Sequence, residues 1–414
     1  MKAPAQFKQE IAGELARTGS PEGFPAFPDI PGGRYTSDEF YQLERERLWT
    51  RVWVLAGRAD DIPAPGDYRT FDDLGAPIVL VRGADGSIRA FYNTCQHRGA
   101  PVVREACGST RRFRCQYHSW SYDITTGSLV QVPDERDFVG LCREERGLVP
   151  VRCEVWGGWV FVNQDPQARS LRDWFGPVLA ELEQFRGEQL QTISVRSETV
   201  TCNWKVTAEA FQEVYHFRHI HSRNGDTALD SRGSTMGLLP NGCSRMVTPF
   251  STTACAGRGM RDWSDWQHFT DQGFIDIPTV DDMVRSTSTA YCMFPNLITP
   301  VAASGFPFLL FWPIDKRTTR LDWIHYAPKD WEGDELPHHW QSRLKTFDQI
   351  MEEDTRNMAP MQRSLESPGL RGVPLNYQER RIWHFHEEID RIIGIDRIPE
   401  ELRIRQLLDQ FVER

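Results

Sequence analysis

Two short cysteine–histidine pairs constrain this chain more than any other feature of its sequence. The first is Cys95-x-His97 and the second is Cys115-x-x-His118, and seventeen residues separate the pairs. Two sulfur and two nitrogen donors can bind one zinc ion, but structural zinc sites usually keep like ligands together within a pair. Mixed pairs place one cysteine and one histidine on each of two neighbouring loops, so both cysteines can bind one iron and both histidines another. The pattern therefore favours a two-iron cluster bridged by sulfide, with zinc as the alternative.

The segments around these pairs predict a β domain. Residues 77–93 and 151–163 each have the pattern of two strands joined by a glycine-containing turn, and the pairs lie between them. We therefore expect residues 50–163 to form one compact β domain. A chain of 414 residues is too long for one small core, so a second domain should follow.

The pattern after residue 164 alternates between helical and extended segments. Helices are expected at 171–186, 203–221, 336–363 and 398–413, and strands at 190–201, 288–299, 306–314 and 320–328. This order predicts a sheet with long helices packed against it, which is an α+β arrangement. Residues 223–285 are rich in Gly, Ser, Thr and Asp, and we expect a mobile lid there.

The composition of the chain argues against nucleic acid and membranes as binding partners. A net charge of −10 argues against a nucleic-acid-binding protein, because a phosphate-binding surface needs a basic excess. No apolar run approaches the roughly 18–20 residues of a membrane span, and the N-terminus has no signal-peptide core. We therefore expect a cytoplasmic protein that binds no membrane. The nine scattered cysteines do not predict a disulfide framework.

A second group of metal-ligand residues lies in one of the predicted helices. It contains His216, His219 and His221, with Glu209 and Glu213 upstream. Ferrous iron that activates oxygen is commonly held by two histidines and one carboxylate, which leave positions open for oxygen and substrate. On a regular helix the spacing of three brings His219 near His216, whereas His221 can serve only if the helix ends or bends after His216. A lone helical histidine is more often structural, but three within six residues beside two carboxylates favour a metal site.

The first motif resembles a known family. Cys-x-His-Arg-Gly followed by Cys-x-x-His-x-Trp is similar to the Rieske domain, in which two cysteines and two histidines hold a [2Fe–2S] cluster. The residues that match the cluster ligands are Cys95, His97, Cys115 and His118. Rieske domains of respiratory complexes carry two further cysteines, where this chain has Ala100 and Tyr117. That difference resembles the lower-potential, oxygenase type of Rieske domain.

The second motif resembles the mononuclear iron site of Rieske oxygenase catalytic subunits, the alpha subunits of the ring-hydroxylating oxygenase family. Asn-Trp-Lys, then Glu-x-x-His-x-x-x-x-His, is similar to the family's pattern. The resemblance selects His216 and His221 as iron ligands, with His219 as the rival.

The third iron ligand is expected from far down the chain. The segment FDQIMEEDTRNMAPMQ (347–362) resembles the family's acidic helix, from which one carboxylate reaches the iron. Asp354 is the expected ligand and Glu353 the alternative. Without the upstream motif, an acidic triplet of this kind is more often a solvated helix face.

Glu213 stands where the family has a carboxylate that links the two metal sites. In the family this carboxylate hydrogen-bonds a cluster histidine of the neighbouring subunit and an iron-ligating histidine, which correspond here to His118 and His216. Most members have aspartate at this position, and this chain has glutamate. Glutamate also occurs in a subset that includes enzymes acting on quaternary amines. The resemblance thus implies that Glu213 connects electron supply with catalysis.

The resemblance covers nearly the whole chain and implies an α+β fold with two domains. An all-β Rieske iron–sulfur domain is expected at 47–163. A catalytic domain with a helix-grip fold, an antiparallel sheet curled around a long helix, is expected from residues 1–46 and 164–414. The family typically forms a head-to-tail homotrimer.

The implied function is that of an oxygenase terminal component. It would contain a [2Fe–2S] cluster and mononuclear Fe(II), take electrons from a separate reductase or ferredoxin, and use O2 to hydroxylate or oxidatively demethylate an aromatic or similarly apolar small molecule. No flavin- or nicotinamide-binding motif is evident. Two alternatives stay open: monooxygenation or N-demethylation of a quaternary amine, such as a betaine or carnitine-like molecule, and a non-catalytic Rieske electron carrier. Monooxygenation and dioxygenation both stay open, as does the presence of a β subunit.

Overall fold

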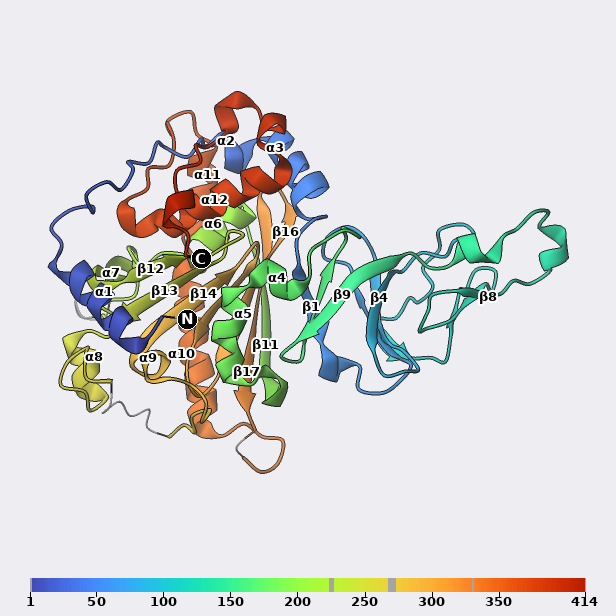
Figure 1. Ribbon diagram of the computed structural model, residues 1–414, viewed down its shortest axis with the longest axis horizontal. Coiled ribbons are helices and arrows are strands. Elements are labelled where there is room, and N and C mark those ends of the chain that lie inside the picture. Colours follow the sequence, from blue (N-terminus) through green and yellow to red (C-terminus); the bar gives the residue numbers. More distant parts are fainter. Residues whose placement is uncertain (1, 223–226, 267–272, 330, 414) are drawn as a thin grey trace. The chain divides into compact units, whose positions relative to one another are not determined.

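The computed structural model describes residues 2–222, 227–266, 273–329 and 331–413, and it separates into two compact units (Figure 1). The larger unit consists of Met1–Leu48 and Trp174–Arg414, and the smaller unit of Trp49–Asp173. The smaller unit is therefore inserted into the sequence of the larger one. Among the described residues, no helix is both long enough and apolar enough to cross a membrane.

The smaller unit is built from antiparallel strands. One sheet has the strand order β1-β10-β9-β4-β3-β2-β5, and a second sheet has the order β6-β7-β8. Gly157 and Gly158 join β9 to β10 with φ angles of 56° and 81°, which glycine adopts without strain. The β domain expected in this part of the chain is confirmed. Its strands are β1 (Val54–Arg58), β2 (Asp67–Phe71), β3 (Ile78–Arg82), β4 (Ile88–Tyr92), β5 (Cys107–Ser109), β6 (Phe113–Arg114), β7 (Ser121–Tyr122), β8 (Leu129–Gln131), β9 (Pro150–Trp156) and β10 (Trp159–Asn163).

The larger unit contains an antiparallel sheet in the order β11-β17-β16-β15-β14-β13-β12. Its strands are β11 (Leu190–Val200), β12 (Thr235–Leu238), β13 (Ser244–Pro249), β14 (Thr287–Met293), β15 (Leu297–Val301), β16 (Phe306–Asp315) and β17 (Thr318–Pro328). Helix α4 (Leu171–Phe175) contains the boundary between the units. The other helices are α1 (Pro4–Ala16), α2 (Gly33–Thr36), α3 (Asp38–Leu43), α5 (Pro177–Leu182), α6 (Trp204–Glu209), α7 (Phe217–Ile220), α8 (Thr252–Gly257), α9 (Asp282–Ser286), α10 (His338–Thr355), α11 (Met358–Leu365) and α12 (Arg380–Ile393). The predicted α+β fold is confirmed.

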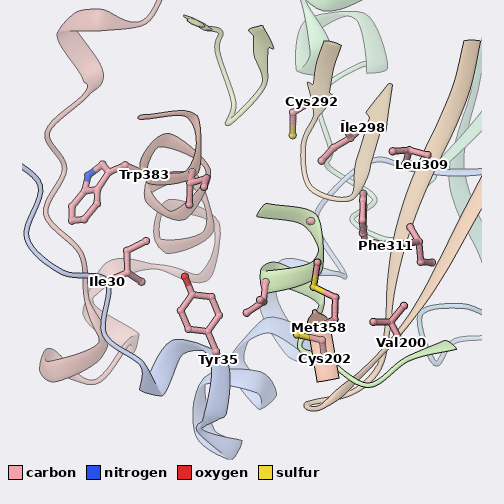
Figure 2. Packing of buried hydrophobic residues seen from close by; sticks show 14 of the residues in the cluster. Ile30, Tyr35, Val200, Cys202, Cys292, Ile298, Leu309, Phe311, Met358 and Trp383 are labelled. Atoms are coloured by element: carbon pink, nitrogen blue, oxygen red, sulfur yellow. The ribbon is translucent and has the colours of Figure 1, made fainter. Parts of the chain in front are cut away.

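One face of this sheet is buried beneath α6, α11, α12 and the N-terminal arm. Figure 2 shows Leu309 and Phe311 of β16 in the same buried cluster as Tyr35 of the arm and Trp383 of α12. Leu309 and Phe311 are two residues apart on one strand, so their side chains point to the same face. Each large apolar side chain buried in such a cluster contributes about 1.5–3 kcal/mol relative to leaving it exposed.

The segment expected as one helix at 203–221 is broken in the middle. α6 and α7 leave residues 210–216 in turns. The Glu213 carboxylate accepts hydrogen bonds from the backbone N–H groups of Tyr215 and His216. Bonds of this kind compete with helical hydrogen bonds, and they explain why the helical periodicity did not produce a continuous helix.

Three further helix predictions and one strand prediction were wrong. The helix expected at 171–186 is divided into α4, α5 and a 3-10 turn, and the strand expected at 288–299 is divided into β14 and β15. The helix expected at 336–363 is divided into α10 and α11. The helix expected at 398–413 is replaced by short 3-10 turns. At the end of this segment the backbone N–H of Glu413 donates to the carbonyl of Leu238 at 2.8 Å, so the chain extends along β12 instead of coiling.

The predicted lid at 223–285 contains regular structure. Strands β12 and β13 belong to the main sheet and pair with each other, and α8 and α9 follow. The polar composition concealed these strands, because both are short and fully buried although they contain polar residues such as Thr235, Ser244 and Arg245. Residues 223–226 and 267–272 of the predicted lid lie outside the described residues.

Candidate metal centres

Two loops of the smaller unit share one backbone pattern. In both, the cysteine N–H donates to the carbonyl five positions later, at 2.8 Å in residues 95–100 and 2.9 Å in residues 115–120. The fourth residue after each cysteine has a left-handed φ, 75° at Gly99 and 60° at Ser119. Its N–H donates back to the cysteine carbonyl, at 3.0 and 2.9 Å respectively. The two loops therefore present their cysteines in equivalent positions.

The side chains of the two loops lie together. Cys95 and Cys115 are both 2% exposed, and the ring centroids of His97 and His118 are 4.6 Å apart. Trp120 stacks on His97 at 4.8 Å and shields it. The Nδ1 atom of His97 is buried and has no hydrogen-bond partner. A buried imidazole nitrogen without a partner is costly, and a bound metal ion would satisfy it.

Tyr122 adjoins the first loop. Its hydroxyl lies 3.2 Å from the Cys95 sulfur and accepts the backbone N–H of Gln96 at 3.0 Å. Burial raises the pKa of Cys95, and the hydrogen bond from Tyr122 opposes that effect. Burial is also the main reason that the pKa of His97 is lowered, which keeps the imidazole in the neutral form that binds metal. Tyr122 could not be predicted from the sequence, because nothing in the cysteine–histidine spacing points to it.

A second centre lies in the larger unit, where α7 meets the end of α10. His216, His221 and Asp354 bring their ligand atoms within 4.8 Å of one another. The Oδ1 atom of Asp354 is 3.5 Å from His216 Nε2 and 3.1 Å from His221 Nε2. Both Nε2 atoms are buried, and neither has a hydrogen-bond partner of acceptable geometry. Two imidazole nitrogens and a carboxylate oxygen around a common point fit the donor set of a mononuclear ferrous site.

The break in the helix explains why two histidines five residues apart converge. His216 is the N-cap of α7 and His221 is its C-cap, so the short helix has one histidine at each end. His219 is exposed, and its ring lies beside that of Tyr215, at 6.3 Å between centroids. The structure therefore brings His221, and not His219, to His216 and Asp354.

Glu353 and Asp354 occupy different positions around His221. Asp354 is 5% exposed and faces the Nε2 atoms. The Oε2 atom of Glu353 lies 2.8 Å from His221 Nδ1, on the opposite side of the ring. A carboxylate at Nδ1 fixes the tautomer that leaves Nε2 free for a metal. Burial alone would lower the pKa of His221, but the interactions with the Asp354 and Glu353 carboxylates raise it overall.

Glu213 has the same relation to His216. Its Oε1 atom contacts His216 Nδ1, and its other oxygen accepts the backbone N–H groups described above. The carboxylate is held at three points and therefore orients the imidazole with Nε2 towards Asp354. The structure places the Glu213 carboxylate at His216 Nδ1.

An apolar wall adjoins this triad. The Phe217 ring lies 4.9 Å from the His216 ring and 5.1 Å from the His221 ring, between centroids. Phe217 packs against a buried cluster of Val214, Met236, Met246 and Ala290. Met246 of β13 faces Met236 of β12 and Ala290 of β14 in the sheet register. This wall could not be predicted from the sequence, because Met236, Met246 and Ala290 are brought together only by strand pairing.

Comparison with known proteins identifies the family. The model of the ring hydroxylating alpha subunit (catalytic domain) matches residues 179–395. The chain belongs to the ring-hydroxylating alpha subunit family. A second model, the Rieske [2Fe-2S] domain, matches residues 52–152 of this alpha subunit, which include both cysteine–histidine loops.

Curated relatives of this alpha subunit include several aromatic dioxygenases. It is 33% identical over 213 residues to the 2-aminobenzenesulfonate 2,3-dioxygenase subunit alpha of Alcaligenes sp, a match that covers 50% of this chain and 54% of that one. It is 37% identical over 192 residues to the benzene 1,2-dioxygenase subunit alpha of Pseudomonas putida, with 44% and 42% covered. In these matches the chain spans about half the length of its relatives.

A longer match joins the alpha subunit to the carnitine monooxygenase oxygenase subunit of Escherichia coli (strain K12). The two are 26% identical over 389 residues, which cover 90% of this chain and 96% of the relative. Among solved structures, the quaternary ammonium Rieske monooxygenase CntA in complex with inhibitor MMV12 has a TM-score of 0.73 at 22% identity, covering 92% of this chain and 100% of that chain. Naphthalene 1,2-dioxygenase from Rhodococcus sp. bound to indole has a TM-score of 0.69 at 20% identity, with 94% and 98% covered. Identities this low establish a shared fold and nothing further.

Proposed function

We propose that this alpha subunit is the terminal component of a Rieske non-heme iron oxygenase, either a monooxygenase or a dioxygenase. The observation that carries the proposal is the His216–His221–Asp354 triad, with its two buried and unpartnered Nε2 atoms. A non-catalytic electron carrier with a docking module would not need a mononuclear metal site. The triad therefore counts against that alternative.

The residues around each centre fit the metal groups of this family. For the [2Fe–2S] cluster the ligands would be Cys95 and Cys115 on one iron and His97 and His118 on the other. For the mononuclear Fe(II) they would be His216, His221 and Asp354. When both groups are bound, the cluster supplies electrons one at a time and the ferrous iron supplies the site of oxygen activation.

Glu213 is a positioning residue in this proposal. It orients His216 through Nδ1 and, by resemblance to the family, would also accept a hydrogen bond from His118 of the partner subunit in a head-to-tail homotrimer. Such a contact would join the electron-accepting domain, residues 47–163, to the neighbour's catalytic domain, residues 1–46 and 164–414. The electrons would come from a separate reductase or ferredoxin.

The substrate class that we propose is an aromatic or similarly apolar small molecule, which is hydroxylated or oxidatively demethylated. The support is the wall beside the triad, whose members carry no charge: Val214, Phe217, Met236, Met246 and Ala290. Burial of apolar substrate surface against such a wall contributes about 25 cal/mol per Å². Methionine sulfur also makes favourable contacts with aromatic rings.

A quaternary amine is the second candidate. Two observations favour it: the match to the carnitine monooxygenase oxygenase subunit covers most of both chains, and this chain has Glu213 where most members have aspartate. Recognition of a quaternary ammonium group needs several aromatic faces or a carboxylate around the cation. Phe217 is the one aromatic residue of the described wall, so this candidate ranks below the first.

A single-turnover experiment tests both candidates. The purified protein is reduced chemically, loaded with Fe(II) and mixed with heavy-isotope O2 and either a pool of aromatic and apolar compounds or a pool of quaternary amines. Mass spectrometry of the products should find the isotope in a compound of the first pool. Label only in the second pool would favour the second candidate. Absence of product together with no stoichiometric iron binding would contradict the oxygenase proposal. The Asp354→Ala variant is the control that should form no product from either pool.

The contact between Tyr122 and Cys95 predicts a shift in the cluster's reduction potential. Tyr122→Phe removes a hydrogen bond to a ligand sulfur, and such bonds favour the reduced, more negatively charged cluster. We therefore expect the potential to fall, as measured by redox titration of the cluster absorbance. Tyr68→Phe, a change in the same buried core without a contact to the cysteine, is the matched control and should leave the potential unchanged. An unchanged potential in Tyr122→Phe would show that the Tyr122 hydroxyl does not donate to a cluster ligand.

A further inference from the structure

Glu209, four residues before Glu213, is not part of the metal triad. It closes α6 and is 8% exposed. Its Oε1 atom lies 2.8 Å from the Nε2 atom of His386 on α12, and its Oε2 atom accepts the hydroxyl of Tyr35 on α2 at 3.1 Å. Two elements far apart in sequence therefore hold one carboxylate.

Arg34 determines where His386 carries its proton. The Nε atom of Arg34 donates to His386 Nδ1 at 3.0 Å. A guanidinium group can only donate, so Nδ1 is the acceptor and the proton is on Nε2, facing Glu209. Burial, reinforced by the charges of Arg34 and Lys205, places the pKa of His386 well below its usual value, and the ring is neutral. His386 thus donates a hydrogen bond to Glu209.

Glu209 is the one carboxylate of this buried cluster that has no cation of its own among the described residues. Two ion pairs flank it, Arg34–Asp390 and Lys205–Glu44, each 2.7 Å long. Its direct partners, Tyr35 and His386, are neutral. Burial raises the pKa of Glu209 to about 7, and the more distant positive charges oppose that rise only in part. The carboxylate therefore changes charge close to neutral pH.

Helix α12 also holds the residues that follow Glu209. The carbonyl of Glu209 accepts the N–H of Gln212 at 2.9 Å. The carbonyl of Gln212 accepts Nη1 of Arg381 at 3.1 Å. Arg381 and His386 both belong to α12, so this helix is hydrogen-bonded to Glu209 and to Gln212, shortly before Glu213.

We propose that Glu209 is a positioning residue, whose carboxylate, held by Tyr35 and His386, fixes the end of α6 so that Glu213 meets His216. The inference rests on the proposed function, because it concerns how an iron ligand is placed. An ionised Glu209 accepts both hydrogen bonds in full. A protonated Glu209 turns one of its oxygens into a hydroxyl, and the hold on α6 weakens. The geometry at His216 should therefore change as pH crosses neutrality.

The surroundings of Glu209 also fix the sign of its effect on stability. The charged and titratable groups that face it or its direct partners include Arg34, Tyr35, Glu44, Cys202, Lys205, Glu379 and His386. Folding raises the pKa of Glu209 from 4.5 to about 7, so the protonated form stabilises the fold. This contribution is complete below about pH 4.5 and is lost as pH rises through about 7. The ionised form that positions Glu213 is thus the less stable one, a trade-off common at functional sites.

Cobalt(II) at the mononuclear site provides a direct test, because its d–d absorption reports coordination geometry without any turnover. The cluster-containing protein is loaded with Co(II) and titrated with acid and base. The wild-type spectrum should change with a midpoint near pH 7, the pKa of Glu209. Glu209→Gln should abolish this transition while still binding Co(II), and it should also flatten the dependence of Tm on pH between about 4.5 and about 7.

Two further variants separate this proposal from a merely structural role. Tyr35→Phe removes a hydrogen bond that lowers the pKa of Glu209, so the spectral midpoint should move to higher pH. Glu379→Gln removes a neighbouring negative charge that raises this pKa, so the midpoint should move to lower pH. A structural role alone would reduce Tm in these variants without moving the midpoint in opposite directions. These variants also keep the proposal testable if Glu209→Gln does not fold.

Two outcomes would overturn the inference, and they differ in what else they overturn. A wild-type protein that binds no Co(II) would contradict the metal site and the proposed function together with it. A protein that binds Co(II) but keeps the same midpoint in Glu209→Gln, or shows no transition, would contradict the role of Glu209 and leave the proposed function standing.

Discussion

Asp354→Ala should abolish stoichiometric iron binding at the mononuclear site. The variant removes the only carboxylate of the described triad, whose Oδ1 atom faces both histidine Nε2 atoms. Loss of a direct ligand should cost more than the roughly 10–100-fold in affinity that loss of an outer hydrogen-bond partner costs. Iron content after loading, and a dissociation constant from competition with a chromophoric chelator, would measure the effect. The cluster absorbance should stay unchanged, because the cysteine–histidine loops are in the other unit.

Glu353→Gln is the matched control for this prediction. Its carboxylate contacts His221 Nδ1 and not Nε2, so its loss should weaken iron binding by at most about 100-fold. His219→Ala should have no effect on iron affinity, because His219 is exposed and outside the triad. If Glu353→Gln lost iron as completely as Asp354→Ala, the assignment of the third ligand would be wrong.

Glu213→Ala should stop turnover and leave both metals bound. The variant removes the carboxylate that holds His216 Nδ1 but no ligand of either metal. Iron affinity should therefore fall by no more than about 100-fold, so that saturating Fe(II) still fills the site. Steady-state turnover with an electron donor should fall by roughly 100-fold, because the proposed link to the partner's cluster is lost as well as the hold on His216. Parallel measurements of iron content, cluster spectrum and product formation would separate these effects.

Glu213→Asp is the informative companion variant. It keeps the charge and restores the residue that most members of the family have, but it is shorter by one methylene. Partial recovery of turnover relative to Glu213→Ala would support a role that depends on both charge and reach. Full activity in Glu213→Ala would remove Glu213 from the electron path. Loss of iron in that variant at saturating Fe(II) would instead show that Glu213 is essential to the mononuclear site.

The parts of the structure that could be predicted from sequence are those encoded by local spacing. The cysteine–histidine pairs indicated two equivalent loops in a β domain, and the loops share one hydrogen-bond pattern. Ser119 shows the limit of this reasoning, because its left-handed φ of 60° fills the place that Gly99 has in the other loop, and nothing in the residue type signals it.

The break between α6 and α7 was hidden for a different reason. Helical periodicity continues across residues 210–216, but the Glu213 carboxylate takes backbone N–H groups that a helix would use. The spacing of His216 and His221 contained the only hint, since five residues fit one metal only if the helix ends. Contacts between residues far apart in the sequence could not be predicted at all. The contact between Glu209 and His386, which are 177 residues apart, is one such case, and the wall beside Phe217 is another.

During synthesis on the ribosome, the smaller unit can fold before the larger unit is complete. The smaller unit is complete once Asp173 has been made, whereas the N-terminal arm of the larger unit waits for Val373 to pair with Ile30 and for Asp390 to pair with Arg34. At about 5–20 residues per second, the arm spends roughly 20–70 s without these partners. We therefore expect the smaller, cluster-binding unit to fold on the nascent chain before His221 and Asp354 of the larger unit come together.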